Sequence, residues 1–213
     1  MAEILTANSA GYSKAAELLR AGQLAALPTD TVYGLAGLAS NQEAIAEIYK
    51  VKNRPKEKAL SVVIFTPDHA KQLVKIPPLA QTLMDEFWPG ALTLVLPALE
   101  HVPTLPDTQT LAVRCPDVGW TKGFMDAGFE GPLVLPSANI SGEAAPVTAA
   151  QTDAAIGDQI PLILDGGTCK KGQESTIIAV DGDRARLLRV GAIAPERLAA
   201  YNIDMANLGK NWV

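Results

Sequence analysis

The stretch "ESTIIAVDGDRARLLRV" (residues 174–190) carries the clearest indication of how this chain folds. Two short apolar runs flank the triplet Asp181-Gly182-Asp183, and an Asp-Gly pair is typical of the tight turn between two antiparallel strands. Residues 174–190 therefore predict a β-hairpin. Because a hairpin joins antiparallel strands, at least part of the sheet is expected to be antiparallel.

Other short apolar runs along the chain have the length of strands and end at Pro, Gly or Asp. They lie at residues 23–27, 60–65, 91–97, 110–116, 131–138 and 160–165. Helical periodicity falls between several of them, at residues 13–22, 41–52, 78–88, 148–158 and 194–201. In the first helix Ser13 is the expected N-cap and Gly22 the residue just after the end. Strands interleaved with helices, together with the hairpin, predict an α/β fold with a twisted, mixed parallel and antiparallel sheet and flanking helices.

Length and composition limit what the protein can be. The chain has 213 residues and 48% hydrophobic content, which is enough to bury the core of one ordinary domain. Its net charge is −5, so general adhesion to nucleic acid or to an anionic membrane is not expected. The first residues lack the charged and apolar regions of a secretion signal, and no run approaches the length of a membrane span. We therefore expect a cytoplasmic protein without a membrane partner.

The residue types needed for several common kinds of active site are scarce. Cys115 and Cys169 lie far apart in sequence, and the chain has two histidines, which leaves little material for a zinc site or a Cys-His pair. We expect both thiols to be buried and reduced. The stretch "GTCKKG" (residues 167–172) has the glycine spacing of a phosphate-binding P-loop, but Gln173 and Glu174 stand where Lys and Ser or Thr are required. A P-loop is excluded.

Cations gather in one short segment, "YKVKNRPKEKAL" (residues 49–60). Pro55 disfavours a helix at Arg54, so the helix that begins near Asn41 should end near Lys52. An extended segment beyond that point would place alternate side chains on one side of the backbone. The cations expected on that side are Lys50, Lys52, Arg54, Lys56 and Lys58, with ordinary solvated lysines as the open alternative for Lys50 and Lys56. This pattern predicts a local binding site for an anion on an otherwise acidic protein.

Five stretches, taken together and in this order, resemble a known family. They are "LPTDTVYGLAG" (27–37), "KNRPKEKAL" (52–60), "VRCP" (113–116), "PSANISG" (136–142) and "GQESTII" with "LLRVG" (172–191). The likeness is to the YrdC/TsaC family of L-threonylcarbamoyladenylate synthases, and it extends from about Ala7 to Tyr201. Single stretches of this kind are weak signals, whereas five in order are specific.

The resemblance implies a YrdC-like fold with a basic concave cleft. It implies one catalytic domain over residues 1–213, with a core of about 7–201 and a short C-terminal tail at 202–213. Some relatives carry a second C-terminal domain; this chain stops at Val213, so we expect the single-domain form.

The activity that the resemblance implies is that of a nucleotidyltransferase. The enzyme would condense L-threonine, bicarbonate and ATP to threonylcarbamoyl-AMP and pyrophosphate, with Mg²⁺ on the phosphates and no metal ligand from the protein. The product would serve the t6A modification of tRNA, received by downstream tRNA threonylcarbamoyltransferase proteins. Weak direct contact with tRNA stays open.

The family's site residues transfer to matching positions of this sequence. The expected catalytic residues are Lys52, Arg54, Ser137 and Asn139. The expected ATP-binding residues are Arg54, Lys58, Thr110, Ser137, Asn139 and Arg189. The expected threonine-binding residues are Thr31, Arg114 and Ser175.

Some relatives carry a histidine where this chain has Val63, so its selectivity for threonine over serine is less well determined than the reaction type.

Two other interpretations stay open on the sequence. The first alternative is a paralogue of the YciO type, with the same fold and an unassigned substrate. The second is a non-catalytic module that binds structured RNA, against which the acidic balance and the aromatic content of 5% argue.

Overall fold

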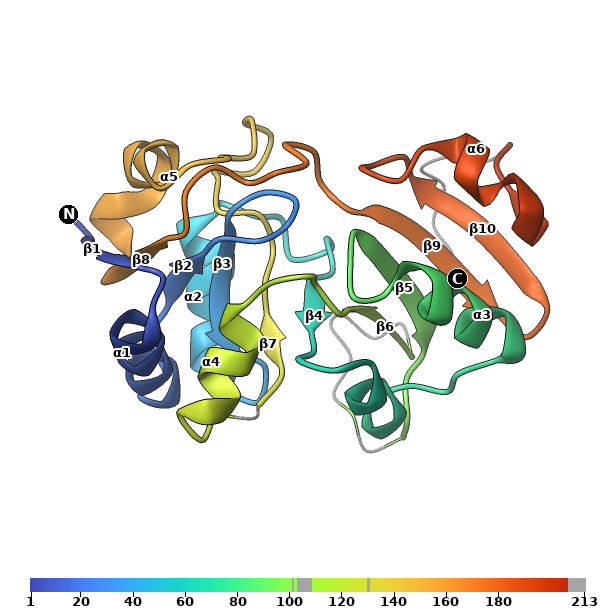
Figure 1. Cartoon of the computed structure of the whole chain (residues 1–213), viewed down its shortest axis with the longest axis horizontal. Coiled ribbons are helices and arrows are strands. Elements are labelled where there is room, and N and C mark those ends of the chain that lie inside the picture. Colours follow the sequence, from blue (N-terminus) through green and yellow to red (C-terminus); the bar gives the residue numbers. More distant parts are fainter. Residues whose placement is uncertain (101, 103–108, 130, 207–213) are drawn as a thin grey trace. The chain divides into compact units, whose positions relative to one another are not determined.

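The computed structural model describes residues 1–100, 102, 109–129 and 131–206, and the chain divides into two compact units. Unit 1 consists of Met1–Lys58 and Val118–Gly172, and unit 2 of Ala59–Asp117 and Gln173–Val213. Both units are built from segments that are distant in the sequence (Figure 1).

The sheet of unit 1 has the strand order β1-β8-β2-β3-β7. These strands are β1 (Glu3–Thr6), β8 (Leu162–Asp165), β2 (Ala25–Leu27), β3 (Gly34–Leu38) and β7 (Leu133–Val134). β8 pairs in parallel with both β1 and β2, whereas β3 pairs antiparallel with β2 and with β7. The sheet of unit 1 is therefore mixed.

The described part of unit 1 also contains four α-helices and one 3₁₀ turn. They are α1 (Ser9–Arg20), α2 (Gln42–Val51), α4 (Trp120–Asp126), α5 (Ala149–Ile156) and the 3₁₀ turn η2 (Gly157–Gln159). α1 packs against α4, α2 against β3, and α5 against β8 (Figure 1). Between α1 and α4 the rings of Tyr12 and Phe124 meet edge to face, with centroids 6.2 Å apart.

The first helix begins earlier than the sequence predicts. Asn8, not Ser13, is its N-cap: the backbone of Asn8 is extended, and its side-chain oxygen accepts a hydrogen bond from the Gly11 amide at 3.1 Å. The helix ends as expected. Ala21 is the C-cap, and Gly22 follows it in the left-handed region.

The sheet of unit 2 has the strand order β4-β6-β5-β9-β10-β11. These strands are β4 (Ser61–Val63), β6 (Thr110–Arg114), β5 (Leu92–Pro97), β9 (Thr176–Asp181), β10 (Arg184–Arg189) and β11 (Ile203–Asp204). The parallel pairs are β4 with β6, β5 with β9, and β10 with β11. The antiparallel pairs are β5 with β6 and β9 with β10. The predicted hairpin at residues 174–190 is thus confirmed.

Two short helical segments and two 3₁₀ turns accompany this sheet. They are α3 (Pro78–Phe87), α6 (Pro195–Leu198), η1 (Pro67–Gln72) and η3 (Ala199–Tyr201). α3 buries an apolar stripe that ends at Phe87, whose ring meets the Tyr201 ring edge to face and carries the Arg197 guanidinium 5.0 Å above its centroid. These contacts hold the C-terminal helical turns against α3.

The predicted fold class is confirmed: a mixed sheet with flanking helices. Among the described residues, the elements without a counterpart in the prediction are β1, β3, β11, α4 and the 3₁₀ turn η1. The sequence of β3 is "GLAGL", and glycine is disfavoured in strands. A Cβ atom at Gly34 would lie 2.7 Å from the Leu135 side chain, so close packing by a distant residue selects glycine there.

Other parts of the sequence prediction stay predictions. These are the basic concave cleft and the single catalytic domain with its core at 7–201. Of the expected tail at 202–213, residues 203–204 form β11, while residues 207–213 lie outside the described residues. Cys115 and Cys169 are buried, as predicted.

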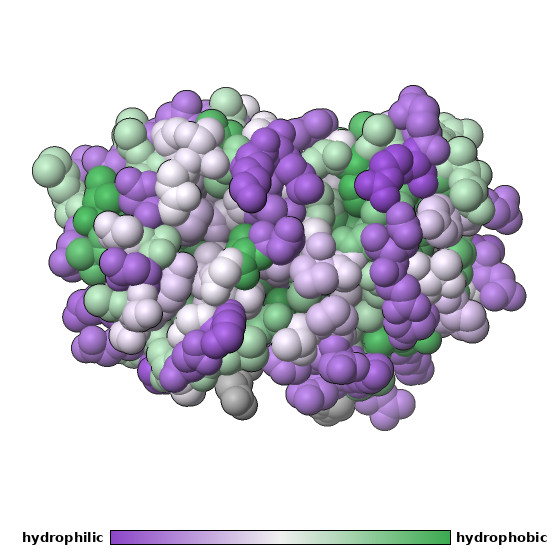
Figure 2. All heavy atoms as spheres, viewed as in Figure 1, coloured by the Kyte–Doolittle hydropathy of each residue, from purple (hydrophilic) through white to green (hydrophobic). Residues whose placement is uncertain are grey.

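The face of the molecule seen in Figure 2 is largely hydrophilic, with hydrophobic residues dispersed between the polar ones. The large exposed apolar side chains of the described chain are Met1, Ile4 and Val190. Scattered residues of this kind are normal on protein surfaces. None of the helices in the described ranges is both long and apolar enough to span a bilayer.

The β9–β10 turn provides a test of the hairpin. Gly182 has φ of +58°, and its Cβ would meet open space, so Gly182→Ala should lower the free energy of unfolding by about 1 kcal/mol through backbone strain alone. Gly119→Ala is the matched control, because Gly119 also faces open space but has φ of −75°. Denaturant titration of both variants measures the difference. Equal stability of the two variants would contradict the assigned turn.

Candidate functional site

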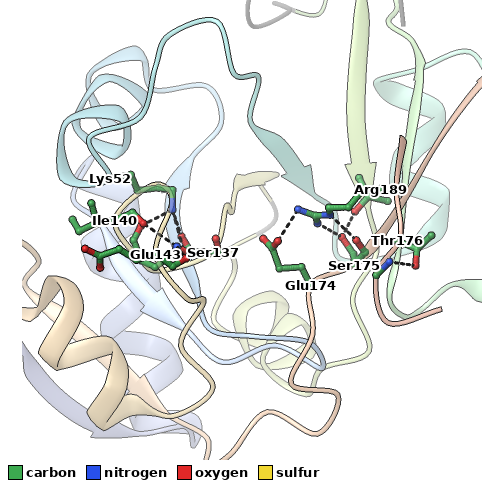
Figure 3. A network of polar contacts seen from close by, with 11 residues as sticks. Lys52, Ser137, Ile140, Glu143, Glu174, Ser175, Thr176 and Arg189 are labelled. Atoms are coloured by element: carbon green, nitrogen blue, oxygen red, sulfur yellow. Dashed lines mark hydrogen bonds and ion pairs between the residues drawn. The ribbon is translucent and has the colours of Figure 1, made fainter. Parts of the chain in front are cut away.

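The end of α2 meets the loop after β7 through one buried ammonium group. Lys52 is 1% exposed, and its Nζ donates to the carbonyl oxygens of Ser137 and Asn139, the latter at 2.7 Å. The Asn139 side-chain oxygen lies 3.4 Å from the same Nζ. We call these three residues the Lys52 cluster (Figure 3). A lysine has three N–H donors, and this cluster offers an acceptor to each of them.

Local sequence explains how the cluster is assembled. Asn41 caps α2 through hydrogen bonds from the Glu43 and Ala44 amides, and the helix ends at Val51, just before Lys52. The Ser141 amide then donates to the Lys52 carbonyl at 2.8 Å. Backbone and side chain of Lys52 thus hold the loop from both sides.

The loop itself is made rigid by Asn139. Its side-chain amide donates to the carbonyls of Ile140 and Glu143, at 2.9 and 2.8 Å. Upstream, Ser137 pairs with Gly34, and the Ala138 amide donates to the Tyr33 carbonyl. Asn is typical of such turns because its side chain bonds to nearby backbone groups.

The prediction that five cations line one side of an extended segment is wrong. Lys50 lies inside α2, is 77% exposed and pairs with Glu47 at 3.1 Å. Lys52 continues the right-handed helical conformation as C-cap, and Asn53 turns the chain with φ of +46°. The side chains of Lys50 and Lys52 therefore point to different environments, one to solvent and one to the protein interior. The predicted end of the helix near Lys52 and the loop after it are confirmed.

Arg54 and Lys58 lie in that loop. The Arg54 Nε donates to the Lys58 carbonyl at 3.0 Å, and the Tyr49 hydroxyl donates to the same oxygen at 3.0 Å. Burial raises the pKa of Tyr49, while the Arg54 charge lowers it. The Lys58 side chain is exposed. The loop thus has a defined shape on its α2 side.

Thr31 lies in a compact turn that precedes β3. The Thr29 hydroxyl accepts from the amides of Thr31 and Val32 and donates to the Val32 carbonyl at 2.6 Å. The Thr29 and Thr31 hydroxyl oxygens are 2.8 Å apart. Both side chains are buried, so the "PTDT" hydroxyls are oriented inside unit 1 and are not merely a surface turn.

Tyr33 ties this turn to a more distant segment, a role that the sequence analysis missed. Its hydroxyl donates to the Gly167 carbonyl at 2.8 Å and accepts from the Gly166 amide at 3.2 Å. Burial raises the pKa of Tyr33 to about 12, so the phenol stays protonated at neutral pH. In the sequence, the position of Tyr33 shortly after "PTDT" was the available signal for a role in the site, but no motif spacing identifies Gly166 and Gly167 as its partners.

In unit 2 a second polar group surrounds Arg189 at the end of β10. The Arg189 Nε donates to the Ser175 carbonyl at 3.0 Å, one terminal nitrogen donates to Glu174 Oε2 at 3.0 Å, and the other to Ser175 Oγ at 3.2 Å. Thr93 Oγ1 lies 2.8 Å from Ser175 Oγ. We call Thr93, Glu174, Ser175 and Arg189 the Arg189 cluster; Figure 3 shows its Arg189, Glu174 and Ser175 side chains directed at one another.

The backbone around Ser175 leaves no space to spare. A Cβ atom at Gly191 would lie 2.4 Å from the Glu174 carbonyl oxygen, so only glycine fits there. The buried Thr176 hydroxyl accepts from the amides of Gly191 and Ile193 and donates to the Ile193 carbonyl. These bonds hold the segment after β10 against the start of β9, next to Ser175.

Strand register places Arg114, a predicted site residue, on the same face of the unit 2 sheet as Thr93 and Arg189. Arg114 pairs with Val63 across β6 and β4, and its Nε donates to the Gly90 carbonyl at 2.9 Å. Val113 pairs with Leu94, which puts the next residue, Arg114, beside Thr93. Thr93 pairs with Ile177, and Ile177 with Arg189. Because paired residues share a face, two arginines and the Thr93 hydroxyl lie along one face of the sheet.

The structure distributes the predicted site residues over both units. In unit 1 it brings together Lys52, Ser137 and Asn139, with Arg54, Lys58 and Thr31 in adjoining loops. In unit 2 it brings together Ser175 and Arg189, with Arg114 on the same sheet face and Thr110 at the start of β6. Their roles toward ATP and threonine stay predictions. Arginine, lysine and hydroxyl groups in such settings suit the binding of carboxylate and phosphate.

In the Arg189 cluster, Thr93 and Glu174 are the residues that the sequence analysis did not predict as site residues. A polar residue inside the buried strand "LTLVLP" was the available signal, and it has no motif to mark it. In the ranges that the structure describes, no three His, Cys, Asp or Glu side chains gather as a metal site would require.

Comparison with known proteins assigns the chain to a family. The family model Sua5_yciO_yrdC, described as telomere recombination, matches residues 17–191. The chain belongs to the Sua5/YciO/YrdC family. The resemblance drawn from the five stretches is thereby confirmed.

Relatives in this family include named enzymes. The chain is 37% identical over 201 residues to the threonylcarbamoyl-AMP synthase of Bacillus subtilis. The matched region covers 92% of this chain and 58% of that protein. It also resembles the solved structure of Pyrococcus abyssi Sua5 in complex with L-threonine, with a TM-score of 0.88 and 35% identity over 94% of this chain and 61% of the other. The chain thus spans about three fifths of these two proteins.

A third similar structure is that of Escherichia coli YciO. Its TM-score is 0.80 over 90% of this chain and 96% of the other, with 20% identity. At this identity the likeness shows the fold alone.

Two lysines of this Sua5/YciO/YrdC member test the Lys52 cluster. Lys52→Met leaves buried carbonyl oxygens without their donor and should lower the free energy of unfolding by about 2 to 4 kcal/mol. Lys50→Met, two positions earlier, removes an exposed ion pair and should cost less than about 0.5 kcal/mol. Denaturant titration compares them. Similar values for both variants would mean that the Lys52 ammonium does not hold the loop.

Proposed function

We propose that this protein is a threonylcarbamoyl-AMP synthase, a nucleotidyltransferase that condenses L-threonine, bicarbonate and ATP to threonylcarbamoyl-AMP and pyrophosphate. The observation that carries the proposal is the likeness to Pyrococcus abyssi Sua5 with bound L-threonine, at 35% identity over 94% of this chain. The Bacillus subtilis synthase supports it independently at 37% identity.

The chemistry fits residues of these types. The threonine amine combines with bicarbonate to a carbamate, with loss of water. A carbamate oxygen then forms a bond to the α-phosphorus of ATP, and the bond between that phosphorus and the α,β-bridging oxygen breaks, so that pyrophosphate leaves. Such a displacement depends on alignment of the reactants and on neutralisation of phosphate charge, for which arginines and lysines suffice.

In this proposal the nucleotide is bound by the residues expected from the family resemblance. Arg54, Lys58, Thr110 and Arg189 would contact ATP, together with Ser137 and Asn139. The Lys52 ammonium already bonds to the Ser137 and Asn139 carbonyls, which supports a role in holding this loop for ATP. L-Threonine would be bound by Thr31, Arg114 and Ser175, the arginine pairing with the carboxylate.

Mg²⁺ enters the proposal with ATP. The family resemblance implies Mg²⁺ on the ATP phosphates, with no metal ligand from the protein. Mg²⁺ bound to the phosphates would offset the charge that gathers on the departing pyrophosphate.

Two alternatives remain as outcomes to be tested. A YciO-type paralogue shares the fold, but the identity to YciO is 20% against 35% to the threonine-bound structure. A module that binds structured RNA without catalysis would show no turnover. Bicarbonate, transfer to tRNA by downstream proteins, weak tRNA contact and a cytoplasmic location stay predictions.

The first functional test is the dependence of ATP cleavage on the co-substrates. With Mg²⁺ present, the purified protein should release pyrophosphate from ATP only when L-threonine and bicarbonate are both supplied, and without any tRNA. The reason is that the attacking carbamate oxygen exists only after amine and bicarbonate have combined. A coupled pyrophosphate assay in degassed buffer measures this.

L-Serine serves as the matched co-substrate in that assay. It lacks one methyl group, which in a fitted pocket is worth roughly 10- to 200-fold in the specificity constant. Pyrophosphate release without bicarbonate would refute the synthase assignment, and a strict requirement for tRNA would do the same.

The second functional test concerns Arg114. Arg114→Lys keeps the charge but loses the planar pair of donors, so threonine affinity should fall about tenfold, measured by calorimetry. Arg184→Lys is the matched control, because Arg184 is the first residue of β10 and its side chain is 78% exposed; this variant should bind threonine like the parent. If the two lysine variants bind threonine equally well, Arg114 does not clamp the carboxylate.

A further inference from the structure

The Ser175 hydroxyl lies in a hydrogen-bond network that includes a residue outside the predicted site. Thr93, in the middle of the sheet of unit 2, is 2% exposed, and Ser175 is 5% exposed. Their hydroxyl oxygens are 2.8 Å apart, a normal hydrogen-bond distance in which either group could be the donor. Which one donates decides what Ser175 can do for a ligand.

The two buried protons restrict the kind of ligand group that Ser175 can contact. Among the residues that the structure describes, Ser175 Oγ is the side-chain partner of the Thr93 hydroxyl. If Ser175 donates to Thr93, the Thr93 proton is left buried without an acceptor. If Thr93 donates to Ser175, the Ser175 proton is the one left, and a ligand oxygen can accept it. With a ligand that accepts from Ser175, the arrangement in which Thr93 donates to Ser175 leaves neither hydroxyl proton without an acceptor.

Arg189 occupies the other acceptor position of Ser175. Its terminal nitrogen lies 3.2 Å from Ser175 Oγ and can only donate, because a guanidinium carries no acceptor. A hydroxyl oxygen has two lone pairs and one proton. With Thr93 and Arg189 on the two lone pairs, the Ser175 proton must go to a third group.

We propose that Thr93 and Arg189 together set Ser175 as a hydrogen-bond donor aimed at an oxygen acceptor of the amino-acid substrate. Thr93 is then a positioning residue that acts through Ser175. This inference rests on the proposed function, because it takes L-threonine as the ligand. It excludes contact of Ser175 with the substrate ammonium group, which has protons but no lone pair to accept one.

The fold makes Thr93 suited to this role. β5 is flanked by β6 on one side and β9 on the other, so its backbone is held by two ladders. A threonine in a strand also has restricted rotation about χ1. Thr93 pairs with Ile177, which places Ser175, two residues before Ile177, diagonally across on the same face. The Thr93 oxygen is held in place by the sheet before any ligand binds, so little entropy is lost on binding.

A double-mutant cycle tests the proposal, with L-threonine binding measured by calorimetry. Thr93→Val removes the hydroxyl and keeps the shape, so the dissociation constant should rise roughly three- to tenfold. Thr93→Ser restores a donor at the same position and should stay within about twofold of the parent. In a Ser175→Ala background, Thr93→Val should have no further effect, because Thr93 acts through Ser175.

Thr152→Val is the matched control. Thr152 is a buried threonine of α5, 0% exposed, whose hydroxyl donates to the Thr148 carbonyl at 2.9 Å. Its replacement should lower thermal stability about as much as Thr93→Val does, yet leave threonine binding unchanged. Thr93→Ala removes the same hydroxyl and gives a second measurement on a smaller side chain.

The outcomes separate this inference from the proposed function. Absence of threonine binding by the parent protein would overturn the proposed function and the inference with it. Binding by the parent that is unchanged in Thr93→Val and Thr93→Ala would overturn the inference alone. So would an equal effect of Thr93→Val with and without Ser175, since Thr93 would then act by another route.

Discussion

The buried ammonium of Lys52 is the interaction on which the arrangement of unit 1 depends most. A charged group inside a protein is tolerated only where acceptors surround it, and here the loop after β7 supplies them from Ser137 and Asn139. In exchange, the loop obtains a fixed shape at the end of α2. The hydrogen bonds that satisfy the Lys52 charge thus also hold Ser137 and Asn139, which the family resemblance assigns to ATP binding.

Unit 2 reaches a comparable result by a different route. Its polar residues come from strands and from the ends of strands, where two ladders already determine the backbone. Arg189 then joins β10 to the start of β9 through three hydrogen bonds. Rigid placement of this kind suits a ligand with several oxygens, because the donors lose little freedom when it binds.

Much of the candidate site could be predicted because its residues occur in short, ordered motifs. Ser137 and Asn139 are two positions apart in one turn, and Ser175 lies at the start of a recognisable hairpin strand. The error concerned the cations. Alternation of Lys50, Lys52 and Arg54 suggested an extended segment with its cations on one side, but α2 continues through Lys50. Burial of Lys52 depends on acceptors 85 and 87 positions away. Local pattern contains no information about such partners.

The sequence by itself determined the alternation of strands and helices, the hairpin at residues 174–190, the end of α2 and the family, since each depends on neighbouring residues or on motifs in order. Only the tertiary structure decided that β3 forms from "GLAGL", that Tyr33 bonds to Gly166 and Gly167, and that Thr93 meets Ser175. The physical reason is the same in all three cases. Close packing and burial of polar groups select partners by distance in space, and those partners lie far apart along the chain.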